Sequence, residues 1–291
     1  MLTFFTQPAG FDIGETGLFL HDATQPLWHA LLVGLGNTLR ASLPALLLAT
    51  LLGLMLALGR RSASRPLRLA AGITVDAVRN VPLLVQLLMW YFLLIEWLPE
   101  PGAAWQLGGG LWLSKGGLAF PWPTAWTAAA DVVASGVWQW PQQGPFNIVG
   151  GAAVTPEYLA VVWALTVYTA AFLAEVIRGG LDAVPDSLPE AATTLGATRW
   201  QTLTWVVLPQ AWRTIVPAAT NQYVNLVKNS SLAVAVGYPD LVSVGNTALN
   251  QTGRTLECLG VMMAAYVVLS LLASLALNAF NRRHAPAGAR S

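Results

Sequence analysis

Long apolar runs dominate the pattern of hydrophobic and polar positions along the chain. A helix needs about 20 consecutive apolar residues to cross the hydrocarbon core of a bilayer. Runs of that length, in which charges are rare, predict five transmembrane helices joined by loops. The expected spans cover residues 37–58, 73–98, 156–177, 209–236 and 259–280, and the fourth is less apolar than the others.

The region between the second and third expected spans, residues 99–155, has a different character. It is rich in Gly, Pro and Trp, and its apolar stretch at 124–140 is short and contains Asp131. We therefore expect an interfacial or re-entrant segment at 124–140 and not a sixth crossing. A further crossing would also invert the orientation of everything that follows it.

Composition agrees with this membrane class. Of the 291 residues, 55% are hydrophobic and 10% are charged, whereas a soluble domain carries about a quarter charged residues. The net charge of +1 gives no sign of a nucleic-acid partner, and the single cysteine excludes a disulfide framework within the chain. The sequence therefore predicts an all-α polytopic membrane protein.

Arg and Lys set the expected orientation, because cytoplasmic loops carry an excess of both. Basic residues cluster after the first, third and fifth expected spans, and only Lys115 and Arg254 fall in the other loops. This alternation predicts a periplasmic amino terminus (residues 1–35) and a cytoplasmic tail (281–291). It also places residues 99–155 in the periplasm and residues 182–209 in the cytoplasm.

The cytoplasmic segment 182–209 has the local chemistry of two short helices joined by a turn. Asp186 or Ser187 can cap the first helix, where Glu190 lies close enough to the amino terminus to favour the helix dipole. Gly196 can leave the helical region and end this helix. Thr198 can then cap a second, amphipathic turn.

The same segment resembles the cytoplasmic signature of ATP-binding-cassette (ABC) importer permeases, which is E-A-A, three residues, G, nine residues and I-x-L-P. Every position of that spacing is present, with Val206 in place of Ile, and Leu188 and Pro189 replace the usual G-Q before the motif. The matching residues are Glu190, Ala191, Ala192, Gly196, Leu208 and Pro209. An isolated E-A-A would indicate only a surface helix, but the full spacing between two spans favours the signature.

Further segments resemble the polar amino-acid branch of that family, near the general L-amino acid and glutamate/glutamine/aspartate/asparagine permeases. They read R-N-V-P-L-L-V-Q-L from Arg79, A-F-L-A-E-V-I-R-G-G from Ala171 and N-L-V-K-N-S-S-L-A from Asn225. The resemblance covers residues 36–280 and implies the type I ABC importer permease fold. It also implies that the 182–209 loop forms a coupling helix that docks on an ATPase subunit.

Charged and polar residues near span depth are candidates for a substrate pathway or gate, because such residues usually face the bundle interior or water. Lys228 lies in a polar run within the fourth span and can bind a carboxylate, or it can be a structural lysine that pairs with Glu175 or backbone carbonyls. Arg79 can alternatively snorkel to the cytoplasmic interface. The full candidate set is Arg79, Glu175, Asn225, Lys228, Asn229, Ser230 and Ser231.

The resemblance further implies the partners of the chain. These are a cytoplasmic ABC ATPase dimer, a second permease subunit (identical or related), a periplasmic amino-acid-binding protein and the lipid of the bacterial inner membrane. The sequence contains no phosphate-binding loop, no His/Cys metal cluster and no nucleophile elbow, so we expect no enzymatic activity and no cofactor in this chain. The alternatives are an ion-coupled secondary transporter, which would need more spans and inverted repeats, or a non-transporting scaffold.

Overall fold

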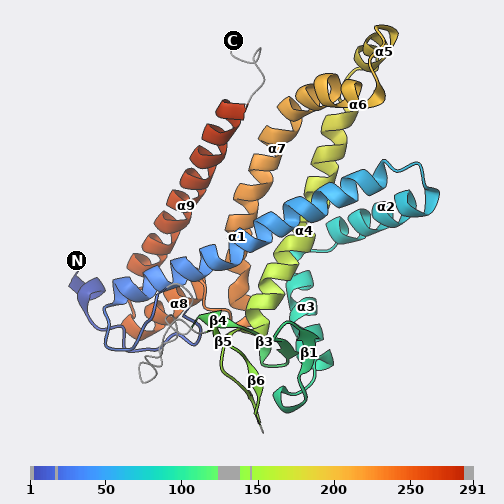
Figure 1. The fold of residues 1–291 in the computed structure, drawn as a ribbon. Helices are drawn as coiled ribbons and strands as arrows, with labels where there is room; N and C mark the ends of the chain where they lie inside the picture. The colour runs from blue at the N-terminus through green and yellow to red at the C-terminus, as the bar shows by residue number, and fades with distance from the viewer. Residues whose placement is uncertain (1–2, 17–18, 124–137, 145, 285–291) are drawn as a thin grey trace.

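A computed structural model describes residues 3–16, 19–123, 138–144 and 146–284 of the chain, and most of them are helical (Figure 1). Short 3₁₀ segments lie at Thr3–Thr6, Pro101–Ala103 and Ser230–Val236. The α-helices are α1 (Leu27–Arg60), α2 (Arg65–Asn80), α3 (Leu83–Trp97), α4 (Pro156–Asp182), α5 (Ser187–Thr194), α6 (Arg199–Gln201), α7 (Leu208–Asn229), α8 (Leu241–Thr252) and α9 (Thr255–His284).

Three helices in the described part of the chain are long and apolar enough to cross a membrane: α1, α4 and α9. They contain the spans predicted at 37–58, 156–177 and 259–280, so these three predictions are confirmed. Helix α1 is longer than the predicted span, because it begins ten residues earlier, at Leu27, in the apolar stretch that precedes Asn37.

The predicted continuous span at 73–98 is wrong, because the chain breaks between α2 and α3 and the two helices meet at 107°. Proline disfavours helical backbone in the residue before it, and Val81, which precedes Pro82, is extended with φ −103° and ψ 129°. The buried side chain of Gln86 donates to the carbonyls of Val78 and Val81 at 2.8 and 2.9 Å. The Gln86 amide therefore stabilises the break by donating to two carbonyls at the end of α2.

The fourth predicted span, 209–236, is helical but not uniform. Helix α7 covers Leu208–Asn229 and the 3₁₀ segment Ser230–Val236 continues it, yet α7 is not among the helices that meet the length and hydropathy requirement. A bent α2–α3 pair counted as one span brings the number of candidate crossings to four.

The all-α prediction is wrong for residues 99–155, where the chain forms small antiparallel sheets. Glycines with positive φ end the strands, among them Gly110 (φ 79°) and Gly117 (φ 104°), and give tight hairpins. One sheet has the order β1-β2-β3-β8, and β4-β5 and β6-β7 form two pairs. The strands are β1 (Trp105–Gly108), β2 (Leu111–Ser114), β3 (Gly117–Phe120), β4 (Trp122–Pro123), β5 (Trp138–Gln139), β6 (Gln142–Gln143), β7 (Ile148–Val149) and β8 (Ala152–Val154).

The interfacial segment expected at 124–140 lies mostly outside the described residues. Only its last three residues are described, and Trp138–Gln139 forms strand β5, paired with β4.

Helices α1 and α4 form the centre of the molecule through a row of small residues. Every fourth residue of α1 is small and buried, which places the row on one face of the helix. Small residues let two membrane helices approach closely and gain packing energy that lipid chains cannot replace. The row consists of Ala41, Ala45, Ala49, Gly53 and Ala57.

Gly53 marks the closest approach in this row. A Cβ atom at Gly53 would lie 2.9 Å from Cβ of Leu173 and 3.1 Å from the carbonyl oxygen of Ala170, both in α4. We expect Gly53→Ala to lower the unfolding free energy by about 1 kcal/mol, because overpacking exceeds the gain in helix propensity. The measurement is thermal unfolding in detergent. Gly260→Ala in α9 is the control, since no atom lies within 4 Å of its Cβ position, and it should be neutral or stabilising. Equal shifts for both variants would refute the close packing.

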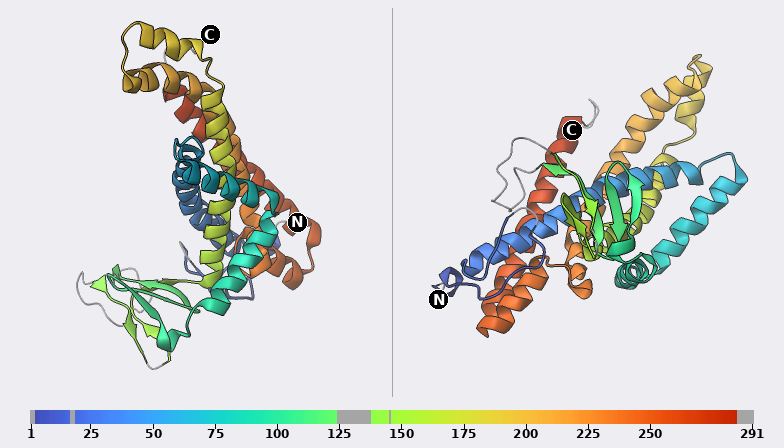
Figure 2. Two further views of the ribbon diagram at one scale, coloured as in Figure 1. Left: turned by 90° about the vertical axis from the view of Figure 1, so that its right-hand side faces the viewer. Right: turned by 60° about the horizontal axis from the view of Figure 1, so that its bottom comes forward.

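Helix α4 connects the two ends of the molecule. Figure 2 shows the strand insert beside one end of α4 and the α5–α6 loop at the other. At the insert end, Arg40 of α1 pairs with Glu15 at 2.6 Å, and Thr155, which caps α4, donates to the same carboxylate at 2.6 Å. The Arg40 guanidinium also lies 4.9 Å from the ring centre of Tyr158. These contacts fix α1, α4 and the amino-terminal segment to one another.

Candidate functional site

Helix α5 carries the E-A-A residues, and its beginning differs from the prediction. Asp186 occupies the capping position, but its backbone is helical and its side chain accepts no capping hydrogen bond. Pro189 lies within the first turn, where its missing N–H costs little, and Glu190 lies in the same turn, as expected. No residue of α5 is buried, so the whole helix is available to a partner.

The end of α5 and the start of α6 confirm the predicted turn. Gly196 has φ +86°, and its N–H donates to the carbonyl of Thr193 at 2.9 Å. The N–H of Ala197 donates to the carbonyl of Ala192 at 3.0 Å, which completes a Schellman motif. Thr198 and Gln201 then form a reciprocal capping box. Local hydrogen bonds therefore fix the angle between the two short helices.

Large apolar side chains, of the kind that usually lie in a protein core, are exposed around this turn. Leu195 is 88% exposed, Trp200 71% and Trp205 74%. Exposed apolar residues that cluster in this way mark an interaction surface. The surface is available to a protein partner or to lipid.

The loop returns to the membrane through a π-helical segment at Thr202–Val207 that leads directly into α7. Pro209 has no N–H to offer to the carbonyl four residues earlier, and the chain takes the wider π geometry just before it. Leu208 and Pro209, the last two signature residues, therefore begin α7 and belong to the same helical rod as its polar end.

Glu175 in α4 is the centre of a charged cluster at the end of the bundle near the loop. Arg178 pairs with it at 3.0 Å, Arg79 of α2 lies 3.8 Å away, and Arg60 of α1 makes a further ion pair with it. Arg178 lies three residues after Glu175 on the same helix, so this pair is local to α4. The carboxylate joins three helices, and it makes no contact with Lys228 among the described residues.

The polar run at the end of α7 is only partly free to bind a ligand. Asn225 and Lys228 are exposed, Asn229 is half-buried and Ser230 is buried. Within the described chain the Lys228 side chain has no hydrogen bond or ion pair, so neither structural partner considered for it is present. The hydroxyl groups of Ser230 and Ser231 donate to the carbonyls of Val227 and Lys228 at 2.7 and 2.8 Å.

Lys228 and Ser231 line a hollow of about 440 Å³ against α9. Helix α9 contributes Tyr266 and Ser270, and the Ser270 hydroxyl is buried without a hydrogen-bond partner among the described residues. Sequence reasoning missed both residues because α9 reads as a plain apolar span. Their spacing of four residues, which places two hydroxyl groups on one helical face, was the available signal.

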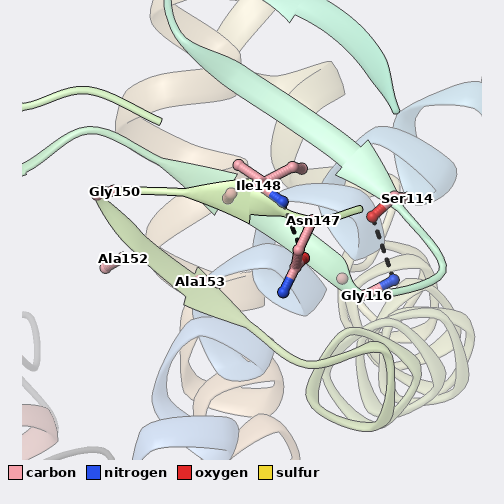
Figure 3. A pocket seen from close by; sticks show the side chains of 10 residues that line it. Ser114, Gly116, Asn147, Ile148, Gly150, Ala152 and Ala153 are labelled. Carbon is pink, nitrogen blue, oxygen red and sulfur yellow. Dashed lines mark hydrogen bonds between the residues drawn. The ribbon is translucent and has the colours of Figure 1, made fainter. Parts of the chain in front are cut away.

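A second hollow, of about 320 Å³, lies within the strand insert (Figure 3). Its lining consists mainly of small residues, and its polar side chains bond to nearby backbone. The Ser114 hydroxyl accepts from the N–H of Gly116 at 3.1 Å, and the Asn147 side chain accepts from the N–H of Ile148 at 2.8 Å. No charged side chain of the described residues lines it, so this hollow has weaker chemistry for an amino-acid ligand than the hollow at Lys228.

Comparison with known proteins places this architecture in a family. Residues 49–288 match the family described as the inner membrane component of binding-protein-dependent transport systems. The chain belongs to this family. The predicted resemblance to importer permeases is therefore confirmed, and the matched residues include the α5–α6 loop, the Glu175 cluster and the end of α7.

Individual relatives agree with the family assignment. The general L-amino acid transport system permease protein AapQ of Rhizobium johnstonii is 36% identical over 95% of this chain and 82% of its own length. The amino-acid ABC transporter permease protein YhdX of Escherichia coli, whose name is provisional, is 35% identical over 96% and 84%. A crystal structure of an amino acid ABC transporter with histidines has a TM-score of 0.63 at 27% identity and covers 88% of this chain and 94% of that chain.

Proposed function

We propose that the chain is the membrane-spanning permease subunit of an ABC importer that carries amino acids across the bacterial inner membrane by alternating access. The observation that carries this proposal is the match to AapQ over 95% of the chain, together with the family match. The expected substrates are polar or general L-amino acids. ATP hydrolysis resides in a separate subunit, so the chain itself is not an enzyme.

The proposed topology has five crossings, a periplasmic amino terminus and a cytoplasmic carboxyl terminus. In Figure 1 the end of α9 and the α5–α6 loop extend toward the same end of the molecule, and the strand insert lies at the other. Arg60, Arg61 and Arg178 gather toward the loop end, as the excess of basic residues in cytoplasmic loops requires. The insert is then periplasmic.

The α5–α6 loop is the proposed ATPase contact. Ala191 and Ala192 give α5 a flat surface that fits a groove, Glu190 can pair with a basic group, and Leu195 and Trp200 supply apolar contact area. The loop connects α4 to α7, and the Gly196 turn fixes its shape. A movement of the ATPase therefore passes to both helices at once.

The assembly that we propose contains two permease subunits, two ATPase subunits and a periplasmic binding protein that delivers the amino acid. In this assembly the ammonium group of Lys228 binds the substrate carboxylate, and Ser231, Tyr266 and Ser270 line the same hollow. Asn225, Asn229 and Ser230 continue the polar surface. Arg79 and Glu175 lie at the cytoplasmic end, where a gate would close.

Uptake into proteoliposomes tests the proposal. The vesicles contain this subunit with the neighbouring permease, ATPase and binding protein, and they receive labelled amino acids and ATP. We expect ATP-dependent accumulation by the wild type, and loss of both uptake and ATPase association in Glu190→Lys. Glu257→Lys is the matched control, since Glu257 is a surface acid of α9 outside the loop and should retain uptake.

Two results would contradict the proposal in different ways. Uptake without the ATPase would favour an ion-coupled transporter and would remove the importer assignment. Wild-type behaviour of Glu190→Lys, with uptake still dependent on ATP, would leave the importer in place and remove the role of α5.

A further inference from the structure

Helix α2 lies across the direction of the spans. It meets α3 at 107°, and the views in Figures 1 and 2 both show it running across the direction of α4. Both ends of α2 lie near the last turns of α4. At one end, Arg79 approaches Glu175. At the other, Arg61, in the turn that joins α1 to α2, pairs with Asp182. In the five-crossing topology proposed above, α3 makes the second crossing and α2 lies along the membrane surface on the side of the α5–α6 loop.

Helix α2 has a buried face and an exposed face. Ala71 and Val75 are buried against the protein, with 6% and 0% exposure. Leu69 and Ile73 form an exposed apolar face, at 64% and 60%. Arg65 and Arg68 lie one turn earlier on the same exposed face, because residues three and four apart are neighbours on a helix. This division is typical of a helix that rests in the interface of a bilayer.

A hollow of about 400 Å³ runs along this exposed face of α2. It is lined by Arg65, Arg68, Leu69, Gly72, Ile73 and Asp76.

The charges in this hollow leave an excess of positive charge. The carboxylate of Asp76 is paired with Arg60 at 3.3 Å. Arg68 donates one hydrogen bond to the carbonyl of Ser62 at 3.3 Å and retains its other donors. Arg65 has no hydrogen bond or ion pair among the residues that the structure describes. Two guanidinium groups therefore face a hollow whose only carboxylate already has a partner.

We propose that this hollow binds the head group of an anionic phospholipid. The phosphate lies against Arg65 and Arg68, whose planar guanidinium groups bind phosphate oxygens in pairs. The acyl chains lie along Leu69 and Ile73.

The surroundings favour a lipid over an acidic protein partner. Helix α2 packs closely on α1, where a Cβ at Gly59 would lie 3.0 Å from Cβ of Ala71. The outer face of α1 carries exposed leucines, among them Leu51 and Leu54. The apolar face of α2 therefore adjoins a second exposed apolar surface, which suits acyl chains. This inference does not depend on the importer assignment, because lipid binding is measured without transport.

Native mass spectrometry of the purified complex with its partner subunits tests the proposal. Phosphatidylglycerol and phosphatidylethanolamine are titrated separately, and we expect tighter binding of phosphatidylglycerol. One basic residue near an anionic surface contributes roughly a fivefold factor, so Arg65→Gln should weaken phosphatidylglycerol by about that factor and the double variant with Arg68→Gln by roughly 25-fold. Arg213→Gln, which removes an exposed arginine of α7, should leave the affinity unchanged.

The single variant keeps the test valid if the double variant does not fold, because Arg65 holds no other described residue in place. Three results would overturn the proposal. One is equal affinity of the variants and the wild type for phosphatidylglycerol. Another is displacement of the lipid by an equimolar amount of inorganic phosphate, which would identify a free-anion site. The last is loss of ATPase association with unchanged lipid binding, which would identify a protein contact.

Discussion

Replacing Glu175 by glutamine should lower the unfolding free energy of the permease by about 2–3 kcal/mol, between the values for surface and buried ion pairs. Glu175 is 20% exposed and is the shared partner of Arg60, Arg79 and Arg178. Without its negative charge, three guanidinium groups from three helices face one another across a half-buried space. Thermal unfolding in detergent gives the shift.

Asp182→Asn is the matched control at the same end of α4. Its carboxylate pairs with Arg61 and Arg178, but its side chain is 45% exposed. Exposed ion pairs contribute about 0–1 kcal/mol, so this variant should change stability little. Equal losses in the two variants would mean that neither the burial of Glu175 nor its third ion pair adds to stability. We also expect salt to reduce the Asp182 effect more than the Glu175 effect.

The apolar spans could be predicted because they depend only on local composition. A run of about 20 apolar residues forms a membrane helix whatever its neighbours are, and α1, α4 and α9 all follow this rule. The break between α2 and α3 depends on more than composition. Pro82 was visible in the sequence, but the apolar run continues through it, and the stabilising contact comes from Gln86. A hydropathy window does not detect such a contact.

The strand insert shows a different limit. Short apolar and polar alternation between glycines, as at Gly108–Gly110 and Gly116–Gly117, is a hairpin signal. The high Trp content of residues 99–155 instead favoured a segment at the membrane surface. The sheet order β1-β2-β3-β8 could not be read from the chain at all, because β8 joins the sheet from more than 30 residues beyond β3.

The candidate sites divide in the same way. The turn at Gly196 and the cap at Thr198 were predicted because both use backbone groups a few residues away. The neighbours of Lys228 in α9 and the pairing of Glu175 with Arg60 and Arg79 were not predicted, since these residues come from other helices. Glu175 lies among arginines from α1 and α2, and Lys228 faces hydroxyl groups of α9. Pairings over this separation require the fold.

Asp240 provides the second large effect, a dependence of stability on pH. It caps α8 between the 3₁₀ segment and that helix, is fully buried, and accepts hydrogen bonds from the N–H of Ser243 at 2.9 Å and the hydroxyl of Tyr266 at 3.1 Å. Burial raises the pKa of Asp240 to about 6 from its usual 3.8, against the opposing effect of these hydrogen bonds. The folded protein therefore holds a proton that the unfolded chain has already lost between about pH 4 and 6.

Stability should therefore fall as the pH rises through this window. The pKa of Asp240 differs by about two units between the folded and unfolded protein, and each unit corresponds to about 1.36 kcal/mol. The unfolding free energy therefore falls by about 3 kcal/mol across the window, and no further loss follows above pH 6. Asn is about as good a helix cap as Asp, so Asp240→Asn should keep the cap and remove the pH dependence. The variant should therefore be more stable than the wild type above pH 6. Tyr266→Phe removes a donor to the carboxylate and should move the window to higher pH. Thermal unfolding of the three proteins from pH 4 to 8 measures both effects. Parallel curves for wild type and Asp240→Asn would show that Asp240 does not titrate in this range.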